Sequence, residues 1–418
     1  MEQKRPLRIL YILNASGGGA TQGILELLRS LPREAYQAFL VVPDQPTERQ
    51  RAIFSGLAQE YFRVPMIWWN LKVDLPWYWR VLVWARGWLK TLGHLLPLWQ
   101  LCKIIREKEI DIVYTNTVMI LDGALAARLC GIPHIWHIKE WIGSKARVKF
   151  FLPDWLLVKV IMGLSERVLV MTQFIGDIFY RYYNDQDKVS IIYDGVDLAD
   201  FQSVGRGLAL RASLGIPAAC FLVGMSASLS ARWKQHGLFI KMASLLSVRF
   251  PEMRFVIFGS TPCKYVNPAY NYPWNYYQTL IAQVKMSDLE GKFYWAGFCE
   301  GIPAMMDALD VLVHPCETEP FGRVAIEAMA AMRPVVGPRR GGIAESIVDR
   351  QTGLLVEPGD PQAFADAVAS LFEQPQLRTA LAGHGPARVA RSFSIEQHVA
   401  QIGAVFQMTC QHKKKRAM

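Results

Sequence analysis

Short apolar segments alternate along the whole chain with longer segments of helical periodicity. This pattern is typical of parallel sheets covered by helices. We expect a first series of strands, followed by a second series: residues 7–13, 38–42, 111–115, 134–138, 167–171 and 189–193, then 221–225, 254–258, 292–295, 311–314, 334–336 and 354–356. Two such series predict an α/β chain of two doubly wound, Rossmann-like domains.

The length of 418 residues, with 51% hydrophobic residues, suits two cores. The sequence Asp194-Gly195-Val196-Asp197 marks the expected boundary. We therefore place a first domain at 1–194, a second at 195–392, and a C-terminal helix with a basic tail at 393–418. Return of that helix to the first domain is one option for its packing.

The net charge of +10 favours anionic partners such as nucleotide phosphates or lipid headgroups. The basic residues are spread along the chain, apart from the run Lys413–Arg416, so we expect no nucleic acid partner. The seven cysteines show no CxxC pair, which favours a reduced, cytoplasmic setting. No uncharged apolar run reaches the roughly 18 residues that a membrane-spanning helix needs.

Two segments combine aromatic and basic residues. The segment Met66–Trp99 is rich in tryptophan, and Lys145–Leu164 places lysines and an arginine beside Phe150 and Trp155. Such a composition suits a membrane interface, because indole rings lie at headgroup level and cations meet anionic lipids. It also suits helices that cover the first sheet. Both interpretations stay open, and with them a peripheral position on the inner face of a membrane.

The most specific motif begins at Glu319-Pro320-Phe321-Gly322-Arg323-Val324 and continues to Glu327. It follows the expected strand 311–314, so a strand leads into a glycine turn that opens a helix. The free N–H groups and the dipole of such a helix bind phosphate. The two carboxylates that flank the turn suit the hydroxyl groups of a sugar and a ribose. Glycine turns at Gly341-Gly342 and Thr352-Gly353 follow the next strands.

Other candidate residues lie outside this motif. Gly17, Gly18 and Gly19 permit close approach of a ligand to the backbone after the first strand. His137 is a suitable hydrogen-bond partner for a sugar hydroxyl, although a histidine that ends a strand is more often structural. Asp185-Gln186-Asp187 looks like a metal-binding motif, but it lies in an expected turn. We therefore expect no metal and no cofactor.

These motifs resemble glycosyltransferase family 4, the retaining GT-B enzymes with two Rossmann-like domains and an interdomain cleft. The resemblance is strongest from Phe293 to about Phe406. The sequence Tyr193–Asp197 is similar to the family's interdomain signature, with Asp194 at the position where the family usually has Asn. It implies that Glu327 holds the ribose, that Glu319 contacts the donor sugar, and that Lys234 binds the diphosphate. The residues that it assigns to the donor site are Gly18, Gly19, Arg232, Lys234, Glu319, Phe321, Gly322, Arg323, Val324 and Glu327, and those that it assigns to catalysis are His137, Lys234 and Glu319.

The chain departs from the family near Lys234. Ser228 stands where an arginine is usual, with Arg232 as a possible substitute, and Gln235 stands where a glycine is usual. The expected function is retaining transfer of a sugar from a UDP- or GDP-linked donor to a saccharide or lipid-linked acceptor, in polysaccharide or glycolipid synthesis. The alternatives are a catalytically silent partner or membrane scaffold, and another GT-B enzyme such as a sugar-phosphate synthase or a nucleotide-sugar epimerase.

Overall fold

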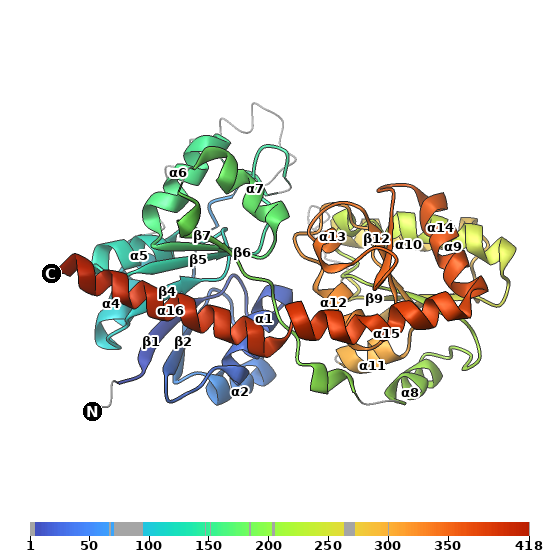
Figure 1. Cartoon of the computed structure of the whole chain (residues 1–418), viewed down its shortest axis with the longest axis horizontal. Coiled ribbons are helices and arrows are strands. Elements are labelled where there is room, and N and C mark those ends of the chain that lie inside the picture. The colour runs from blue at the N-terminus through green and yellow to red at the C-terminus, as the bar shows by residue number, and fades with distance from the viewer. Residues whose placement is uncertain are drawn as a thin grey trace. The chain divides into compact units, whose positions relative to one another are not determined.

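The computed structural model describes residues 5–66, 68–70, 95–146, 148–150, 152–183, 185–202, 205–262, 272–299 and 301–417. The chain divides into two compact units. The first unit comprises Met1–Gly195 together with Ile395–Met418, and the second comprises Val196–Ser394. Each unit is built around one parallel sheet with helices on both faces (Figure 1).

The sheet of the first unit has the strand order β3-β2-β1-β4-β5-β6-β7. Side chains alternate along β1, so that Ile9 and Tyr11 enter one core layer while Leu10 and Ile12 enter the other. This alternation of apolar residues to both faces explains why the strand is fully buried from Ile9 to Ile12. The strands are β1 (Leu7–Ile12), β2 (Tyr36–Val42), β3 (Glu60–Arg63), β4 (Ile112–Thr115), β5 (His134–Ile138), β6 (Arg167–Val170) and β7 (Val189–Ile191).

Helices cover both faces of this sheet. The described helices are α1 (Gly19–Ser30), α2 (Glu48–Leu57), α4 (Leu95–Glu107), α5 (Asp122–Cys130), α6 (Asp154–Leu164), α7 (Gln173–Tyr182) and α16 (Ile395–Ala417), with a short 3-10 turn η1 (Gln186–Lys188). The last helix, α16, packs beside α1 and places Ile402, Val405 and Phe406 in the same core layer as Tyr11 (Figure 1). The end of the chain therefore completes the N-terminal unit.

The second unit repeats the same winding, with the strand order β10-β9-β8-β11-β12-β13. Its strands are β8 (Leu222–Ser226), β9 (Arg254–Phe258), β10 (Phe293–Gly297), β11 (Val311–Val313), β12 (Val335–Pro338) and β13 (Gly353–Val356). Its helices are η2 (Leu198–Phe201), α8 (Arg206–Ser213), η3 (Arg232–Lys234), α9 (His236–Arg249), α10 (Tyr272–Met286), α11 (Ile302–Asp307), α12 (Arg323–Ala330), α13 (Ile343–Ser346), α14 (Pro361–Glu373) and α15 (Pro375–Ser392). The predicted class of two doubly wound α/β units is confirmed.

Some predicted elements differ in extent. Strand β3 was not predicted, because it is a partly exposed edge strand without an apolar run. The segment expected to be helical from Lys145 becomes helical only at Asp154, after Pro153, and Ile142 forms an isolated bridge with Val148. The second unit extends to Ser394, and the Val196 N–H at its start donates to the Phe393 carbonyl near its end at 2.9 Å.

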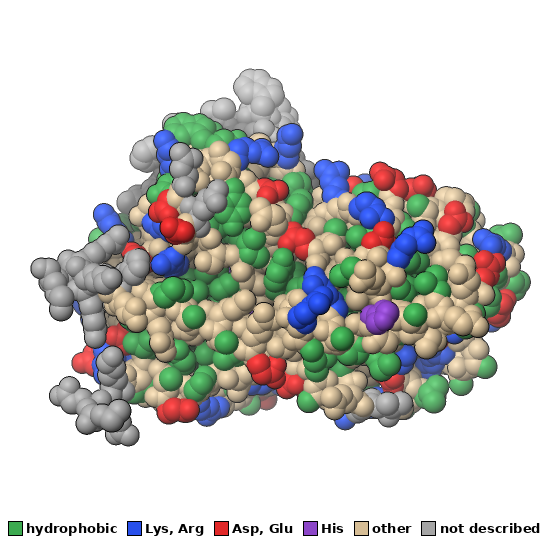
Figure 2. Space-filling model, viewed as in Figure 1, with side chains coloured by type: hydrophobic (Ala, Val, Ile, Leu, Met, Phe, Trp, Pro, Cys, Tyr) green, Lys and Arg blue, Asp and Glu red, His purple; other side chains and the backbone are tan. Residues whose placement is uncertain are grey.

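Most of the tryptophan-rich segment, residues 71–94, lies outside the described residues, as do residues 263–271 of the aromatic loop 262–277. The Trp69 ring packs 4.7 Å from Phe150, whereas Trp99 and Trp155 are exposed. Within the described part of the chain, no helix has the length and apolar character needed to cross a membrane. On the face drawn in Figure 2, basic and acidic side chains are interspersed.

Candidate functional site

In both sheets the strand order reverses between the first strand of the unit and the fourth. Ligands of doubly wound sheets bind beyond the carboxyl ends of the strands at this switch point. In the second unit the two strands are β8 and β11. The segments that follow them carry Lys234 and Glu319, so the topology itself brings these two motifs to one place.

The side chains of Lys234, His314 and Glu319 form one connected cluster. Lys234 Nζ lies 2.5 Å from Glu319 Oε2, and His314 Nε2 lies 2.9 Å from the same oxygen. The Lys234 ammonium also lies 4.2 Å from the centre of the Trp233 ring. The sequence singled out Lys234 and Glu319, but it missed His314, whose only signal is its position at the end of a strand five residues before Glu319.

The charge state of this cluster follows from its contacts. Burial by itself raises the pKa of Glu319, but the Lys234 ammonium and the His314 hydrogen bond hold that pKa well below its usual range. Burial lowers the pKa of His314, which the adjacent carboxylate only partly opposes. At neutral pH the cluster therefore holds an ionised carboxylate, which is suited to accept hydroxyl groups and unsuited to donate a proton.

The glycine turn before α12 has the geometry that the motif predicts. Gly322 has a φ of +81°, and a Cβ at this position would lie 2.9 Å from the Ile343 side chain. Both the left-handed conformation and the close packing therefore require glycine. The turn directs the first N–H groups of α12 toward the carboxyl edge of the sheet.

The second carboxylate of the motif lies inside α12. Glu327 is buried, and its Oε1 accepts a hydrogen bond of 2.8 Å from Arg323 Nε, one helical turn earlier. Phe321 is also buried, with its ring 5.9 Å from that of Phe393, while Val324 is partly exposed. Arg323 thus neutralises the charge of Glu327. The i, i+4 spacing of the two residues on a helix favours such a pair.

The turn Gly341-Gly342 supports the loop of Glu319. The Gly342 N–H donates to the Glu319 carbonyl at 2.7 Å, and a Cβ on Gly341 would lie 2.8 Å from the Glu317 carbonyl oxygen. The glycine turn after β12 therefore fixes the backbone of the loop after β11. This contact links two motifs that the sequence presents separately.

The segment in which the chain departs from the family also has a defined structure. Ser228 Oγ lies 2.9 Å from Ser230 Oγ and 3.0 Å from Ser260 Oγ, so three hydroxyl groups gather after β8 and β9. Arg232 is exposed on the turn η3. Gln235 has a φ of +61°, a left-handed conformation, which explains on physical grounds why glycine is favoured there.

In the first unit the loop Gly17–Gly19 follows β1 and opens α1. Gly18 caps the helix with a φ of +100°, and a Cβ on Gly18 or Gly19 would meet nothing within 4 Å. The loop is fixed from Ser16, whose N–H and Oγ donate to Asp44 at 2.7 and 2.9 Å. Sequence reasoning missed Asp44, which follows the second strand without any motif.

His137 lies on β5 and is completely buried. Its Nδ1 is hydrogen-bonded to the Tyr114 hydroxyl, and its Nε2 has no partner within the described part of the chain. Burial, reinforced by Lys139, holds the pKa of His137 well below its ordinary value, so the imidazole is neutral. A neutral ring can donate or accept a hydrogen bond at Nε2 but carries no charge to a ligand.

Next to His137 the structure reveals an ion pair that the sequence did not predict. Lys139 Nζ lies 2.5 Å from Asp194 Oδ1, and both side chains are buried. Glu140 is buried beside them, where its Oε1 accepts from Thr117 Oγ1 at 2.5 Å. Burial raises the pKa of Glu140. The sequence does carry one signal for this pair, because Asp194 stands where the interdomain signature usually has Asn. An acidic side chain that becomes buried needs a partner of opposite charge.

Three atoms of the second unit have spacing that suits a metal ion. Ligand atoms of His314, Cys316 and Glu319 lie within 4.8 Å of one another. Lys234 already meets the charge of Glu319, and burial raises the pKa of Cys316 to about 12, which keeps the thiol protonated. These contacts disfavour a cation there. The turn with Asp185 and Asp187 lies elsewhere, at the start of β7, and the Asp187 carbonyl accepts from Arg167.

The fold and the site together define a class of protein. Two Rossmann-like units, the second with a lysine, a carboxylate and a glycine-started helix at its switch point, are the components of a GT-B protein. Comparison with known families agrees with this class. Residues 17–200 match the family described as Glycosyltransferase Family 4, and residues 209–388 match Glycosyl transferases group 1.

Individual relatives extend the comparison. The chain is 27% identical over 306 residues to a D-inositol 3-phosphate glycosyltransferase of Streptomyces avermitilis, which covers 70% of this chain and 64% of the relative. The match thus spans less than two thirds of that relative's length. A crystal structure of Anabaena HepE in complex with UDP and glucose is similar, with a TM-score of 0.76, 21% identity, and coverage of 96% of this chain and 99% of that one.

A glycosyltransferase of Rickettsia africae is equally similar in fold, with a TM-score of 0.77, 17% identity, and coverage of 97% and 98% of the two chains. At these identities the solved structures show the fold, and the family assignment comes from the sequence matches. The chain belongs to the GT-B glycosyltransferases of the family 4 type.

Proposed function

We propose that this protein is a retaining glycosyltransferase that transfers a sugar from a nucleotide-sugar donor to a saccharide or lipid-linked acceptor. The observation that supports this most is the cluster of Lys234, His314 and Glu319 at the switch point of the second unit. The cluster combines a cation for a diphosphate with an ionised carboxylate for sugar hydroxyl groups. Glu327, on the helix α12 that Gly322 caps, supplies a second carboxylate for the ribose.

In this proposal the diphosphate of the donor competes with Glu319 for the Lys234 ammonium. Lys234 and the first N–H groups of α12 stabilise the charge that develops on the departing nucleotide. The acceptor hydroxyl attacks from the face that the nucleotide leaves, which preserves the anomeric configuration. A phosphate oxygen of the leaving group takes the proton of the acceptor, so Glu319 serves as an anchor and not as an acid or base.

Donor binding gives the direct test. We expect the full-length protein to be stabilised against heat by UDP or GDP, with UDP first because the similar Anabaena protein binds it. Glu327→Ala and Lys234→Ala should each weaken nucleotide binding at least tenfold in calorimetry. Glu373→Ala, on the surface helix α14, is the matched control and should bind like wild type. Wild-type transfer by Glu327→Ala would refute the assignment.

The second candidate is a catalytically silent scaffold of the same fold. It is favoured by the Ser228, Ser230 and Ser260 hydroxyl groups, which provide no positive charge where the family usually has an arginine. A panel of radiolabelled nucleotide sugars separates the candidates. Nucleotide binding without release or transfer of any sugar supports the scaffold, and analysis of the products distinguishes transfer from a sugar-phosphate synthase or an epimerase.

A lipid-linked acceptor and a peripheral position at an anionic membrane are supported by exposed aromatic residues on the first unit. Trp99 on α4 is 61% exposed and Trp155 on α6 is 49% exposed, with Lys103 Nζ 5.7 Å and Lys159 Nζ 5.3 Å from the respective ring centres. We expect flotation with anionic liposomes and its loss in the double variant Trp99→Ala/Trp155→Ala. Retained flotation by that variant would show that Trp99 and Trp155 do not hold the protein on the membrane. Met286→Ala, at an exposed position of the second unit, is the control and should float like wild type.

A further inference from the structure

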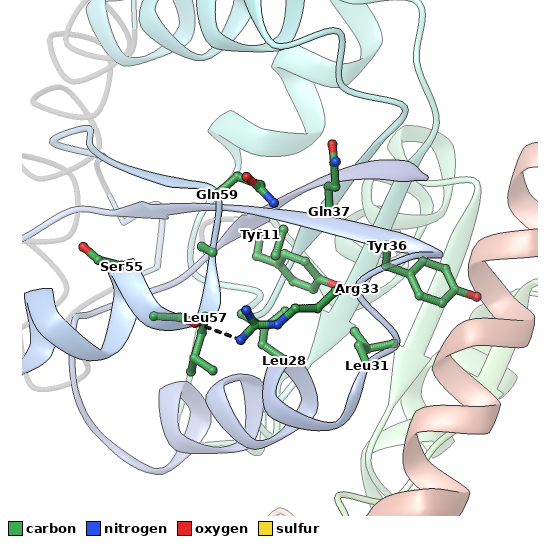
Figure 3. A pocket seen from close by; sticks show the side chains of 12 residues that line it. Tyr11, Leu28, Leu31, Arg33, Tyr36, Gln37, Ser55, Leu57 and Gln59 are labelled. Atoms are coloured by element: carbon green, nitrogen blue, oxygen red, sulfur yellow. Dashed lines mark hydrogen bonds between the residues drawn. The ribbon is translucent and has the colours of Figure 1, made fainter. Parts of the chain in front are cut away.

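The two faces of the first sheet carry different reactive groups. On the face covered by α1, a hollow is lined by Arg33, which already donates to the Gly56 carbonyl at 2.8 Å (Figure 3). The Tyr11 hydroxyl beneath this hollow is completely buried, so a ligand does not reach it. The core layer on the opposite face contains Cys102 and, packed against that layer, Cys130. These two thiols take no part in the proposed mechanism.

The two cysteines lie on adjacent helices, although they are far apart in the sequence. Cys102 belongs to the buried face of α4, and Cys130 is the last residue of α5. The small side chains of Ala126 and Ala127 on α5 are fully buried and permit α4 and α5 to pack closely. The spacing of the two cysteines forms no motif, so their proximity depends on the packing of these two helices.

The contacts between the two cysteines are reciprocal. Cys102 Sγ lies 4.0 Å from the carbonyl oxygen of Ala126, one helical turn before Cys130, and Cys130 Sγ lies 4.0 Å from the carbonyl oxygen of Cys102. Burial, and after it the hydrogen bond with the Cys130 thiol, raises the pKa of Cys102 to about 11. A disulfide bond joins two sulfur atoms at about 2.05 Å on neighbouring elements. Two thiols that already contact each other from packed helices are placed to form such a bond.

We infer that Cys102 and Cys130 form a reversible disulfide bond when the protein is exposed to a peroxide. Cys130 is partly exposed at the end of α5, so its thiolate can attack hydrogen peroxide, which gives a sulfenic acid at Cys130 and one water. The Cys102 sulfur then attacks the Cys130 sulfur, which forms the S–S bond and releases a second water. In total the two thiols lose two electrons and two protons, and one hydrogen peroxide becomes two waters.

The difference in burial sets the order of the two steps. Cys102 is only 8% exposed, and its raised pKa leaves little thiolate at neutral pH, so it reacts with a sulfur atom beside it and not with the oxidant. The bond would join α4 to α5 and close residues 103–129 into a loop. Such a cross-link stabilises a folded unit by restricting its unfolded chain. The inference goes beyond the proposed function and does not depend on it.

Mass spectrometry of the full-length protein after brief treatment with hydrogen peroxide tests the inference. After alkylation of the remaining thiols, trypsin releases Cys102 in the peptide 91–103 and Cys130 in the peptide 129–139. We expect these two peptides as one joined species that disappears after reduction with a phosphine. The melting temperature should rise by at least about 3 °C on oxidation and return on reduction. Cross-linking should be faster at higher pH, because both steps use a thiolate.

Single variants identify the two sulfur atoms. Cys102→Ser and Cys130→Ser should each abolish the joined species. Cys102→Ser should also leave a sulfenic acid at Cys130, which dimedone traps. Cys299→Ser, at a partly exposed thiol of the second unit, is the matched control and should form the joined species like wild type.

Two outcomes overturn the inference. The first is oxidation of Cys299 by a dose of peroxide that leaves Cys102 and Cys130 unjoined, whether both are recovered as alkylated thiols or Cys130 as a sulfinic acid. The second is a bond from Cys130 to another cysteine of the chain or to a second copy, which peptide mapping and a gel without reductant reveal. Either result would leave the two thiols as packing residues between α4 and α5.

Discussion

At the scale of single residues, the molecule pairs its buried charges with short contacts. Lys139 and Asp194 show this in the first unit, and in the second unit the buried Glu319 is paired with the partly buried Lys234. Removal of one partner from a buried pair leaves an uncompensated charge, which costs about 3–5 kcal/mol, whereas removal of both charges is often neutral. The two members of such a pair therefore behave as one unit.

The pair in the first unit permits a double-mutant test. Lys139→Met should lower the free energy of unfolding of that unit by about 3 kcal/mol, because Asp194 stays charged and buried. The double variant Lys139→Met/Asp194→Asn should recover most of this loss. Hydrogen exchange of β5 and β7 as a function of urea measures both. If the double variant instead loses the sum of the unfolding free energies that the two substitutions cost singly, the charges of this pair do not stabilise the unit.

The buried histidines predict a dependence of stability on pH. Burial lowers the pKa of His236 to about 4 and that of His134 to about 3. Between these values and the ordinary value of about 6.5, the unfolded chain binds protons that the folded chain does not, so stability falls as the pH falls through this range. His236→Gln should reduce the slope by up to about 1.4 kcal/mol per pH unit.

Urea unfolding at pH 7 and at pH 5, followed by hydrogen exchange of α9, measures this slope. His384→Gln, on the surface of α15, is the matched control and should retain the wild-type slope. An unchanged slope in His236→Gln would contradict the assignment of a neutral, buried imidazole.

At the scale of elements, the turn into α12 depends on both conformation and packing. Gly322→Ala combines a φ of +81° with a Cβ 2.9 Å from Ile343, whereas Gly291→Ala has a φ of +76° and no atom within 4 Å. Both variants pay the cost of a left-handed alanine, about 1 kcal/mol, but only Gly322→Ala must also displace Ile343.

We therefore expect Gly322→Ala to destabilise the second unit by about 1–3 kcal/mol more than Gly291→Ala does. It should also weaken UDP binding, because the turn directs the N-terminus of α12. Thermal unfolding and calorimetry measure the two effects. Equal losses of stability in both variants would show that the Ile343 side chain moves aside without a cost in free energy.

At the scale of the whole molecule, the N-terminal unit is completed by the last helix of the chain. Phe406 is fully buried beside Tyr11, Tyr36 and Tyr114, although nearly 300 residues separate it from the nearest of them in sequence. Such a contact makes the stability of the first unit depend on the end of the chain.

Phe406→Ala should destabilise the first unit by about 3–5 kcal/mol through loss of buried area and the cavity that remains. Gln407→Ala, exposed on the same helix, is the control and should stay within about 0.5 kcal/mol of wild type. Hydrogen exchange should show faster opening of β1 and α1 in Phe406→Ala. Wild-type protection of β1 would contradict the role of α16 in this core.

The alternation of strands and helices, the two sheets and the motif from Glu319 to Glu327 could be predicted from the amino-acid sequence. These features are local: apolar runs specify buried parallel strands, and glycine specifies a left-handed turn. Four features became visible only in the folded chain: the edge strand β3, the packing of α16, the pair of Lys139 with Asp194 and the bond from His314 to Glu319. Each of these depends on which distant segments become neighbours, and the spacing of residues along the chain does not contain that information.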